Sequence, residues 1–322
     1  SIKAHITRIL DELEDDYSLS VAANVSNGIS NYTTEFVKVT ISASVRLDRH
    51  SIVVPSPESD EDTTLFAIVR GANKSVEWET TGYCTEVNDG HITIKANVIG
   101  KDTIVVKTIE GNATDTCFVI VGAFPSEFTV NAQGKKVHIS QGNLWYDGTK
   151  FNIEPKQDGF HGYDSGNDTW GLFGWSTVSS SYGKIISGAY YGDFVDWGKA
   201  MDNGGTWRTL TIAEWQYLCS GARMINRKPS YSNKTGGISI GGTSYHGVFI
   251  YPDNYAGEEV SGSMTWDDIN SAGIIFLPAA GFRRGSDTDV VGVFGYYWSS
   301  TAYYSGLVYH VHFNGDGVDL DN

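Results

Sequence analysis

The feature that most constrains the fold is a two-residue alternation near the C-terminus. Residues 308–314 place Tyr309, Val311 and Phe313 on one face, and His310, His312 and Asn314 on the other. This period is that of a β-strand, whose successive side chains point to opposite sides of a sheet. One face therefore suits a core, and the other carries rings and an amide that stack and hydrogen-bond. For Tyr309, which shares the apolar face, both a core position and a binding position remain open.

Composition narrows the class of protein. A chain of 322 residues is long enough for two or three domains. Its 37 glycines, 13% aromatic residues and only 19% charged residues favour a β-rich protein with many turns over a helical bundle. The net charge of -15, with no run of Lys or Arg longer than two, disfavours nucleic acid and an anionic membrane surface as partners.

Cysteine usage and hydropathy exclude two further classes. Cys84, Cys117 and Cys219 allow one disulfide at most, so the chain is not a disulfide-stapled module. A buried Cys117 thiol is the simpler expectation, and a Cys84–Cys117 bridge is the alternative. No stretch approaches about eighteen apolar residues, which predicts no membrane span. The amphipathic, charged N-terminus is unlike a signal peptide. If Ser1 is the natural start after removal of Met, retention in the cytosol until assembly or cell lysis is expected.

Residues 1–35 are predicted to form an N-terminal attachment or oligomerisation segment of helix and strand. An amphipathic helix is expected over residues 2–17, where apolar residues recur at three- and four-residue steps: Ile2, Ile6, Ile9, Leu13 and Tyr17. Because so short a helix is marginal alone, we expect it to dock on a partner or on copies of itself. The alternative is a helix that caps its own domain. The first expectation makes the protein a homo-oligomer.

Residues 36–122 are predicted to form a small antiparallel β-sandwich. Alternation over residues 37–47 indicates a half-buried strand, and short strands then recur about every ten residues. They are expected at 64–69, 75–79, 91–96, 103–108 and 116–121, with turn signals such as Asn88-Asp89-Gly90 between them.

The motifs of this region resemble, in their order, bacterial immunoglobulin-like domains. They are SIVV (51–54), VEWET (76–80), GHITI (90–94), GKDTI (100–104) and TCFVIV (116–121). The resemblance implies a spacer or adhesive module without catalytic residues, and Trp78 as its core tryptophan. Residues 123–126 are then expected to be a short linker, because Pro125 and small residues end the preceding strand.

Residues 127–322 are predicted to form an α+β domain, because two short helices stand among many short strands and long loops. Thr211 with Glu214, and Thr265 with Asp268, have the spacing of helix-capping boxes. Gly273 suits the end of the second helix.

Motifs across this region resemble a domain of gut Bacteroidetes and their phages. The opening is FTVNAQGKKVHISQGNLWY (128–146), followed by WGLFGW (170–175), WRTLT (207–211), EW (214–215), YPDN (251–254), FLPAAG (276–281) and GYYWSST (295–301). The chain is similar here to a C-type-lectin-fold family of the formylglycine-generating-enzyme-like kind, which includes receptor-binding proteins diversified by retroelements. The resemblance implies a constant scaffold with variable exposed residues near the C-terminus. We expect the scaffold tryptophans to be core residues: Trp170, Trp175, Trp197, Trp207, Trp215 and Trp298.

The variable positions implied by this resemblance define the expected ligand-binding site. The site residues are Tyr303, Tyr304, Ser305, Tyr309, His310, His312, Asn314 and Asp316, while Leu307, Asp319 and Asp321 match further variable positions. Surfaces rich in Tyr, Ser and Asn are typical of antibody paratopes.

Enzyme and metal-site interpretations have less support. The formylglycine-generating reaction needs cysteine chemistry, but the domain holds only Cys219, which is expected to be a core thiol. No carboxylate pair has a spacing that singles it out for glycoside hydrolysis. His310 and His312 with Asp316 remain an alternative set of metal ligands, and residues 164–168 offer oxygens to calcium without EF-hand spacing. We expect no catalytic residue, metal or cofactor.

These patterns together predict a β-rich multidomain protein that binds a receptor and is not an enzyme. The preferred expectation is a phage virion fibre or decoration protein at the virion surface, and the alternative is a cell-surface or pilus-tip adhesin of a gut bacterium. The expected partners are a glycan or protein receptor, and virion or pilus proteins reached through the N-terminal segment.

Overall fold

The computed structural model describes residues 19–21, 24–26, 31–33, 37–39, 43–54, 63–71, 73–80, 84–88, 90–94, 100–184, 192–201, 207–219, 230–231, 237–304, 306–314 and 317–319. The chain divides into two compact units, one of residues 1–52, 61–95 and 102–119, the other of residues 53–60, 96–101 and 120–322. Strands predominate over helices in the described ranges, so the predicted β-rich character is confirmed. No helix within those ranges is long and apolar enough to cross a bilayer.

Two short antiparallel strand pairs begin the first unit. Strand β1 (Leu19–Val21) pairs with β4 (Val37–Val39), and β2 (Asn24–Ser26) pairs with β3 (Asn31–Thr33). The helix predicted over residues 2–17 lies outside the described residues.

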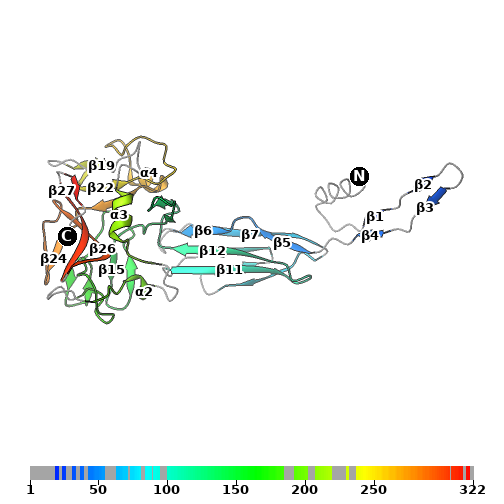
Figure 1. Cartoon of the computed structure of the whole chain (residues 1–322), viewed down its shortest axis with the longest axis horizontal. Coiled ribbons are helices and arrows are strands. Elements are labelled where there is room, and N and C mark those ends of the chain that lie inside the picture. The colour runs from blue at the N-terminus through cyan, green and yellow to red at the C-terminus, as the bar shows by residue number, and fades with distance from the viewer. Residues whose placement is uncertain are drawn as a thin grey trace. The chain divides into compact units, whose positions relative to one another are not determined.

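Eight further strands form two four-stranded sheets (Figure 1). They are β5 (Ser44–Leu47), β6 (Ser51–Val54), β7 (Thr63–Arg70), β8 (Val76–Glu79), β9 (Cys84–Asn88), β10 (His91–Ile94), β11 (Gly100–Thr108) and β12 (Thr114–Val121). One sheet has the order β5-β7-β10-β9 and the other β6-β12-β11-β8. The strands predicted from residue 64 onward are confirmed, to within a few residues at their ends.

The core of this unit is built from alternate residues of the strands. Leu47, Leu65, Ile92, Ile104, Val106 and Val119 are fully buried. Cys117 is buried among them as a free thiol, so the alternative of a bridge to Cys84 is wrong. Burial raises the pKa of the Cys117 thiol to about 11. Trp78, expected to be a core tryptophan, is half-buried in the edge strand β8, where it alternates with the exposed Glu77 and Glu79.

The second unit contains many short strands and three described helices. The strands are β13 (Phe128–Thr129), β14 (Lys136–Val137), β15 (Leu144–Tyr146), β16 (Phe151–Ile153), β17 (Tyr163–Asp164), β18 (Thr169–Trp170), β19 (Ser230–Tyr231), β20 (Ile238–Ile240), β21 (Thr243–Tyr245), β22 (Gly247–Ile250), β23 (Ile275–Pro278), β24 (Phe282–Arg284), β25 (Asp287–Asp289), β26 (Gly295–Tyr304), β27 (Leu307–Asn314) and β28 (Gly317–Asp319). The helices are α2 (Gly198–Met201), α3 (Ile212–Leu218) and α4 (Trp266–Ser271).

The antiparallel strands β22 and β23 separate two hydrophobic cores. All four residues of each strand are buried, as expected for strands covered on both faces. Val248, Ile250, Ile275 and Leu277 face a core that also holds Phe124, Phe128, Trp215, Leu218, Val311 and Phe313. Phe249 and Phe276 face a second core with Ile240, Tyr251, Ile269 and Ile274. The two-residue period of the strands thus assigns neighbouring residues to different cores.

Both predicted capping boxes are confirmed. Thr211 Oγ1 accepts a bond from Glu214 N at 3.2 Å, and Glu214 Oε2 accepts one from Thr211 N at 3.0 Å. Thr265 and Asp268 make the same reciprocal bonds at 3.2 and 2.8 Å. Gly273, after α4, has a φ of 63°, the left-handed conformation that commonly ends helices.

The expected tryptophan positions are largely those of a core. Trp170, Trp175, Trp197 and Trp215 are buried, whereas Trp207 and Trp298 are half-buried. Residues 123–126, expected to be a linker, do not behave as one. Ala123 and Phe124 are buried, Phe124 N donates to Ile139 O at 3.1 Å, and the Phe124 ring joins the core around Phe128. The small residues beside Pro125 therefore belong to a segment packed in the core, and not to a linker.

Gly295, at the start of β26, packs directly against an aromatic ring. A Cβ atom there would lie 2.0 Å from Phe313 Cζ, whereas one at Gly262 would find its nearest neighbour at 3.3 Å. We expect Gly295→Ala to lower the free energy of unfolding by about 1–3 kcal/mol, because the buried Phe313 ring must shift. Urea unfolding measures this, with Gly262→Ala as the control. A Gly295→Ala protein as stable as its parent would contradict the packing.

Candidate functional site

The predicted alternation near the C-terminus is confirmed over Val311, His312, Phe313 and Asn314, in an antiparallel hairpin. Strand β26 pairs with β27, and β28 adds a third strand that the sequence did not reveal. Val311 and Phe313 are buried, and Tyr297 of β26 stacks on Phe313 with ring centroids 5.9 Å apart. Tyr297 Oη donates to Pro278 O at 2.9 Å, and burial raises the pKa of this phenol. The inner face of the hairpin is therefore part of the core.

Indole groups fix the outer edge of β26. Trp175 Nε1 donates to Ser299 O at 2.9 Å, and Trp215 Nε1 donates to Trp298 O at 3.3 Å. Both donor rings are buried. These bonds satisfy carbonyls that would otherwise be open on a strand edge, and they hold the base of the hairpin against the domain.

The outer face of the hairpin is a stack of rings and not an open surface. The ring of His312 lies parallel to that of Tyr296, 4.7 Å away, and stacks on Phe294 at 5.4 Å. His310 contacts Tyr296 at 5.6 Å and Trp298 at 5.9 Å. Both imidazoles are half-buried, and His312 Nε2 has no hydrogen-bond partner among the described residues. The rings of this face stack, as expected, and cross-strand aromatic residues leave the two imidazoles only partly open to solvent.

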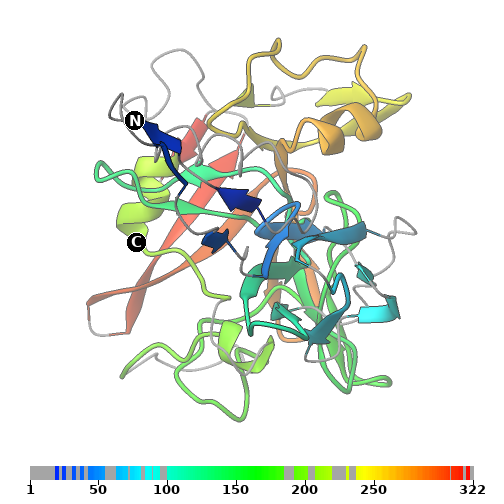
Figure 2. The same ribbon diagram turned by 90° about the vertical axis from the view of Figure 1, so that its right-hand side faces the viewer.

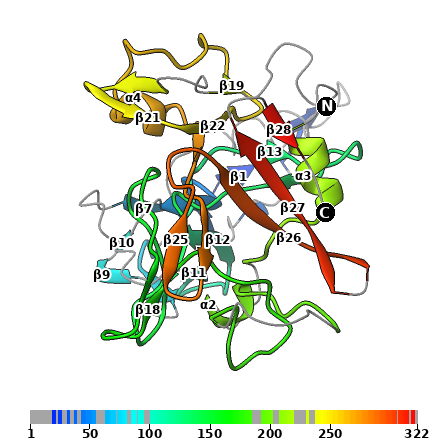
Figure 3. The ribbon, with the colours of Figure 1, turned by 90° about the vertical axis from the view of Figure 1, so that its left-hand side faces the viewer.

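Side chains at the end of the hairpin are exposed to solvent. Tyr304 is 70% exposed, Leu307 49% and Tyr303 44%. Tyr304 and Leu307 are cross-strand partners, and Gly306 in the turn has a φ of 83°, which glycine adopts without strain. Figures 2 and 3 show, from opposite sides, that the strands at this end project beyond the other elements of the second unit in outline.

Tyr309 belongs to the hairpin end and not to the core. A register shift between Trp298 and Ala302 interrupts the simple alternation. Tyr309 is half-buried, and its ring meets that of Tyr303 edge-on with centroids 4.9 Å apart. Tyr303 in turn contacts Tyr304 at 6.1 Å. The three tyrosines thus form one cluster, which the structure brings together as the sequence suggested.

The other predicted site residues are not part of this cluster. Asn314 is half-buried at the far end of β27, where it pairs with Gly317, and Asp319 is exposed in β28 opposite His312. Ser305, Asp316 and Asp321 lie outside the described residues.

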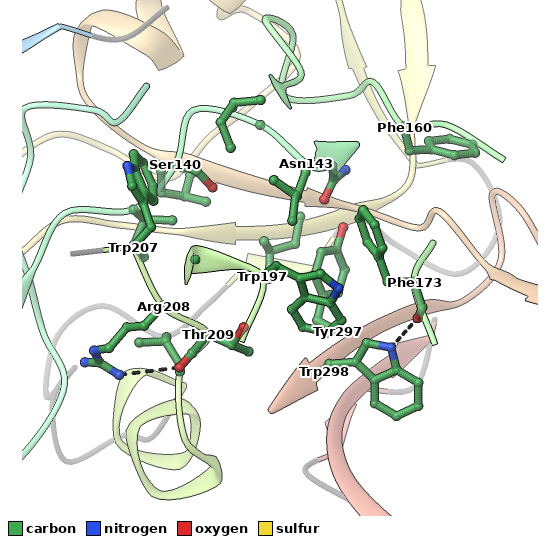
Figure 4. Close-up of a pocket in the computed structure, with 18 of the residues that line it drawn as sticks. Ser140, Asn143, Phe160, Phe173, Trp197, Trp207, Arg208, Thr209, Tyr297 and Trp298 are labelled. Carbon is green, nitrogen blue, oxygen red and sulfur yellow. Dashed lines mark hydrogen bonds between the residues drawn. The ribbon is translucent and has the colours of Figure 1, made fainter. Parts of the chain in front are cut away.

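A cavity of about 1040 Å³ adjoins the base of the hairpin. Trp298 and His310 line it together with Phe173, Trp197 and Trp207 (Figure 4). The rings of Phe173 and Trp197 lie 5.4 Å apart, and Trp298 Nε1 donates to Phe173 O. The aromatic residues that line the cavity thus also connect the hairpin to the loops that precede it in the chain.

Three basic side chains that line this cavity, Lys135, Arg208 and Arg283, are held by hydrogen bonds. Glu214 accepts bonds from Lys135 Nζ at 3.0 Å and from both terminal nitrogens of Arg208 at 2.5 and 2.7 Å. Burial acts to raise the pKa of Glu214, but the bonds from Arg208, Thr211 N and Lys135 outweigh it and lower the pKa to about 2. The buried Arg283 donates to four main-chain oxygens, of Leu172, Gly183, Lys184 and Gly285. These ions hold loops in place.

The alternative metal sites gain no support from the described side chains. Within those residues, no three His, Cys, Asp or Glu side chains lie close enough together to hold a metal ion. The rings of His310 and His312 are 6.4 Å apart between centroids. Asp164, in the loop considered for calcium, uses its oxygens to accept bonds from Gly166 N at 2.8 Å and Asn167 Nδ2 at 2.7 Å.

Comparison with known proteins gave no match, either among protein-family models or among curated proteins.

Proposed function

We propose that this protein is a non-enzymatic receptor-binding protein whose contact surface is the end of hairpin β26–β27. One observation carries the proposal: Tyr303, Tyr304 and Leu307 are exposed together on a strand pair whose base is fixed by buried tryptophans. Tyrosine supplies a large contact area at a small cost in conformational entropy, and a fixed backbone reduces the cost of binding further.

The architecture that fits this function is an immunoglobulin-like spacer followed by a C-type-lectin-like head. The two four-stranded sheets of the first unit are consistent with the spacer. In the second unit, the family-like motifs supply the buried tryptophans, the two capped helices and the final hairpin. This supports a constant scaffold that carries a variable end.

The proposed place of display is the surface of a phage virion, as a fibre or decoration protein. The alternative is the surface of a gut bacterium. In either case many copies would act together, and avidity would raise a modest affinity of each head. Mass spectrometry of purified virions distinguishes the two, because the virion proposal requires the chain among the virion proteins.

The proposed function is tested by the binding of the full chain to whole cells. Labelled protein is titrated onto a panel of gut Bacteroidetes strains, with excess unlabelled protein as competitor. Saturable, competed binding to a subset of strains is expected. Equal, non-saturable adherence to every strain, or no binding to any, would contradict receptor recognition.

A further inference from the structure

The exposed end of the hairpin lies in a segment without formal charge. Residues 295–314 contain no Asp, Glu, Lys or Arg, although the chain as a whole has 38 acidic and 23 basic residues. Among the described residues of this end, the exposed side chains are Ala302, Tyr303, Tyr304 and Leu307. A contact made by this end must therefore draw its free energy from apolar burial and tyrosine hydrogen bonds, and not from ion pairs.

The shape of this end is convex. In the outline of both end views, the strands at this end project beyond the other strands and helices of the second unit (Figures 2 and 3). Tyr304 and Leu307 face each other across the two strands, and Tyr303 is held edge-on against Tyr309. A projecting apolar group is desolvated fully only by a concave apolar surface, which is how the central anchors of protein interfaces are buried.

A carbohydrate fits this end poorly. Sugar hydroxyls need polar side chains beside the stacking ring, because binding sites fix their ligands with a few well-placed polar groups. Among the described exposed side chains of this end, only the tyrosines carry a polar group. Asn314 is at the far end of β27, and His310 and His312 are half-buried in the ring stack. A single sugar ring stacked on Tyr304 would also leave Leu307 in water.

We infer that the receptor is a protein, and that it offers an uncharged apolar cleft to Tyr303, Tyr304 and Leu307. This inference rests on the proposed function. It narrows the receptor from a glycan or a protein to a protein. The contact buries apolar surface, so its affinity is insensitive to ionic strength, since salt screens charges and not apolar contacts.

The experiment uses the full chain and a strain that it binds. One portion of the cells is shaved with a broad-specificity protease and another is treated with periodate, which cleaves vicinal diols of sugars. We expect the protease to abolish binding and periodate to leave it unchanged. We also expect less than about a twofold change in Kd between 50 and 500 mM NaCl. Binding that survives protease but is lost after periodate would overturn the inference and leave the proposed function intact.

A matched pair of variants of this chain tests whether Leu307 is buried in the receptor. Leu307 and Val293 are both exposed aliphatic residues, at 49% and 55%, but only Leu307 is at the hairpin end. We expect Leu307→Ala to weaken binding about tenfold and Val293→Ala to leave Kd within about twofold. An unchanged Kd for Leu307→Ala, or a Kd that rises steeply with salt, would overturn the inference. Absence of binding to every strain would remove the proposed function as well.

Discussion

Replacing Tyr303 and Tyr304 together with Ala should weaken cell binding at least about 30-fold, equivalent to about 2 kcal/mol. The two rings are open to solvent, so their removal leaves the core intact while removing the main contact area. The loss should appear as a higher Kd with an unchanged number of sites in the titration of labelled protein onto cells. Thermal unfolding of the variant should match that of the parent.

The matched control removes two exposed rings from the first unit. Phe66 and Phe118 are 50% and 47% exposed, between the values for Tyr303 (44%) and Tyr304 (70%). The variant with Phe66→Ala and Phe118→Ala should bind as tightly as the parent. If the Phe variant loses binding and the Tyr variant does not, the contact surface belongs to the sandwich and the proposed function fails in its present form.

Glu214 is expected to be the ion whose loss destabilises the second unit most. It is buried, caps α3 and accepts bonds from two cations. We expect Glu214→Gln to lower the free energy of unfolding at pH 7 by about 3 kcal/mol, because a buried network is broken while the basic side chains remain. Urea unfolding followed by tryptophan fluorescence measures this, and eight of the nine tryptophans lie after residue 122.

The lowered pKa of Glu214 also makes the free energy of unfolding depend on pH in the acid range. Its pKa is about 2 in the folded protein and 4.5 ordinarily, so its contribution is complete above pH 4.5 and is lost as the pH falls towards 2. The parent should therefore lose more stability between pH 7 and pH 3 than the Glu214→Gln variant does. Glu259→Gln, at an exposed carboxylate, is the control and should behave as the parent. Identical acid dependence in parent and Glu214→Gln would contradict the assignment.

Features that depend on neighbours in the chain were predictable. The strand period gave Val311 and Phe313 their place in the core, and the capping-box spacing located α3 and α4. In each case the local chemistry and the tertiary packing favour the same conformation. The exposure of Tyr303 and Tyr304 likewise agrees with the variable positions implied by the family resemblance.

Features that depend on distant pairing were not predictable. Burial of His310 and His312 arises from Tyr296, Phe294 and Trp298 across the hairpin. Sequence spacing cannot show it, because it depends on the register. The sequence does not decide between a core and a binding position for Tyr309 for the same reason, since no sequence motif marks the register shift in β26. Phe124 seemed to belong to a linker because its burial depends on packing with residues far along the chain.

The most direct test of the account places a photo-crosslinker at the hairpin end. Tyr304 is replaced by p-benzoylphenylalanine in one full-length protein and Phe66 in another, and each is illuminated on cells that bind the parent. We expect a covalent adduct with a cell-surface protein from position 304 and none from position 66. An adduct from position 66 alone, or none from position 304 while the protein remains bound, would contradict the assignment of the hairpin end as the receptor-binding surface.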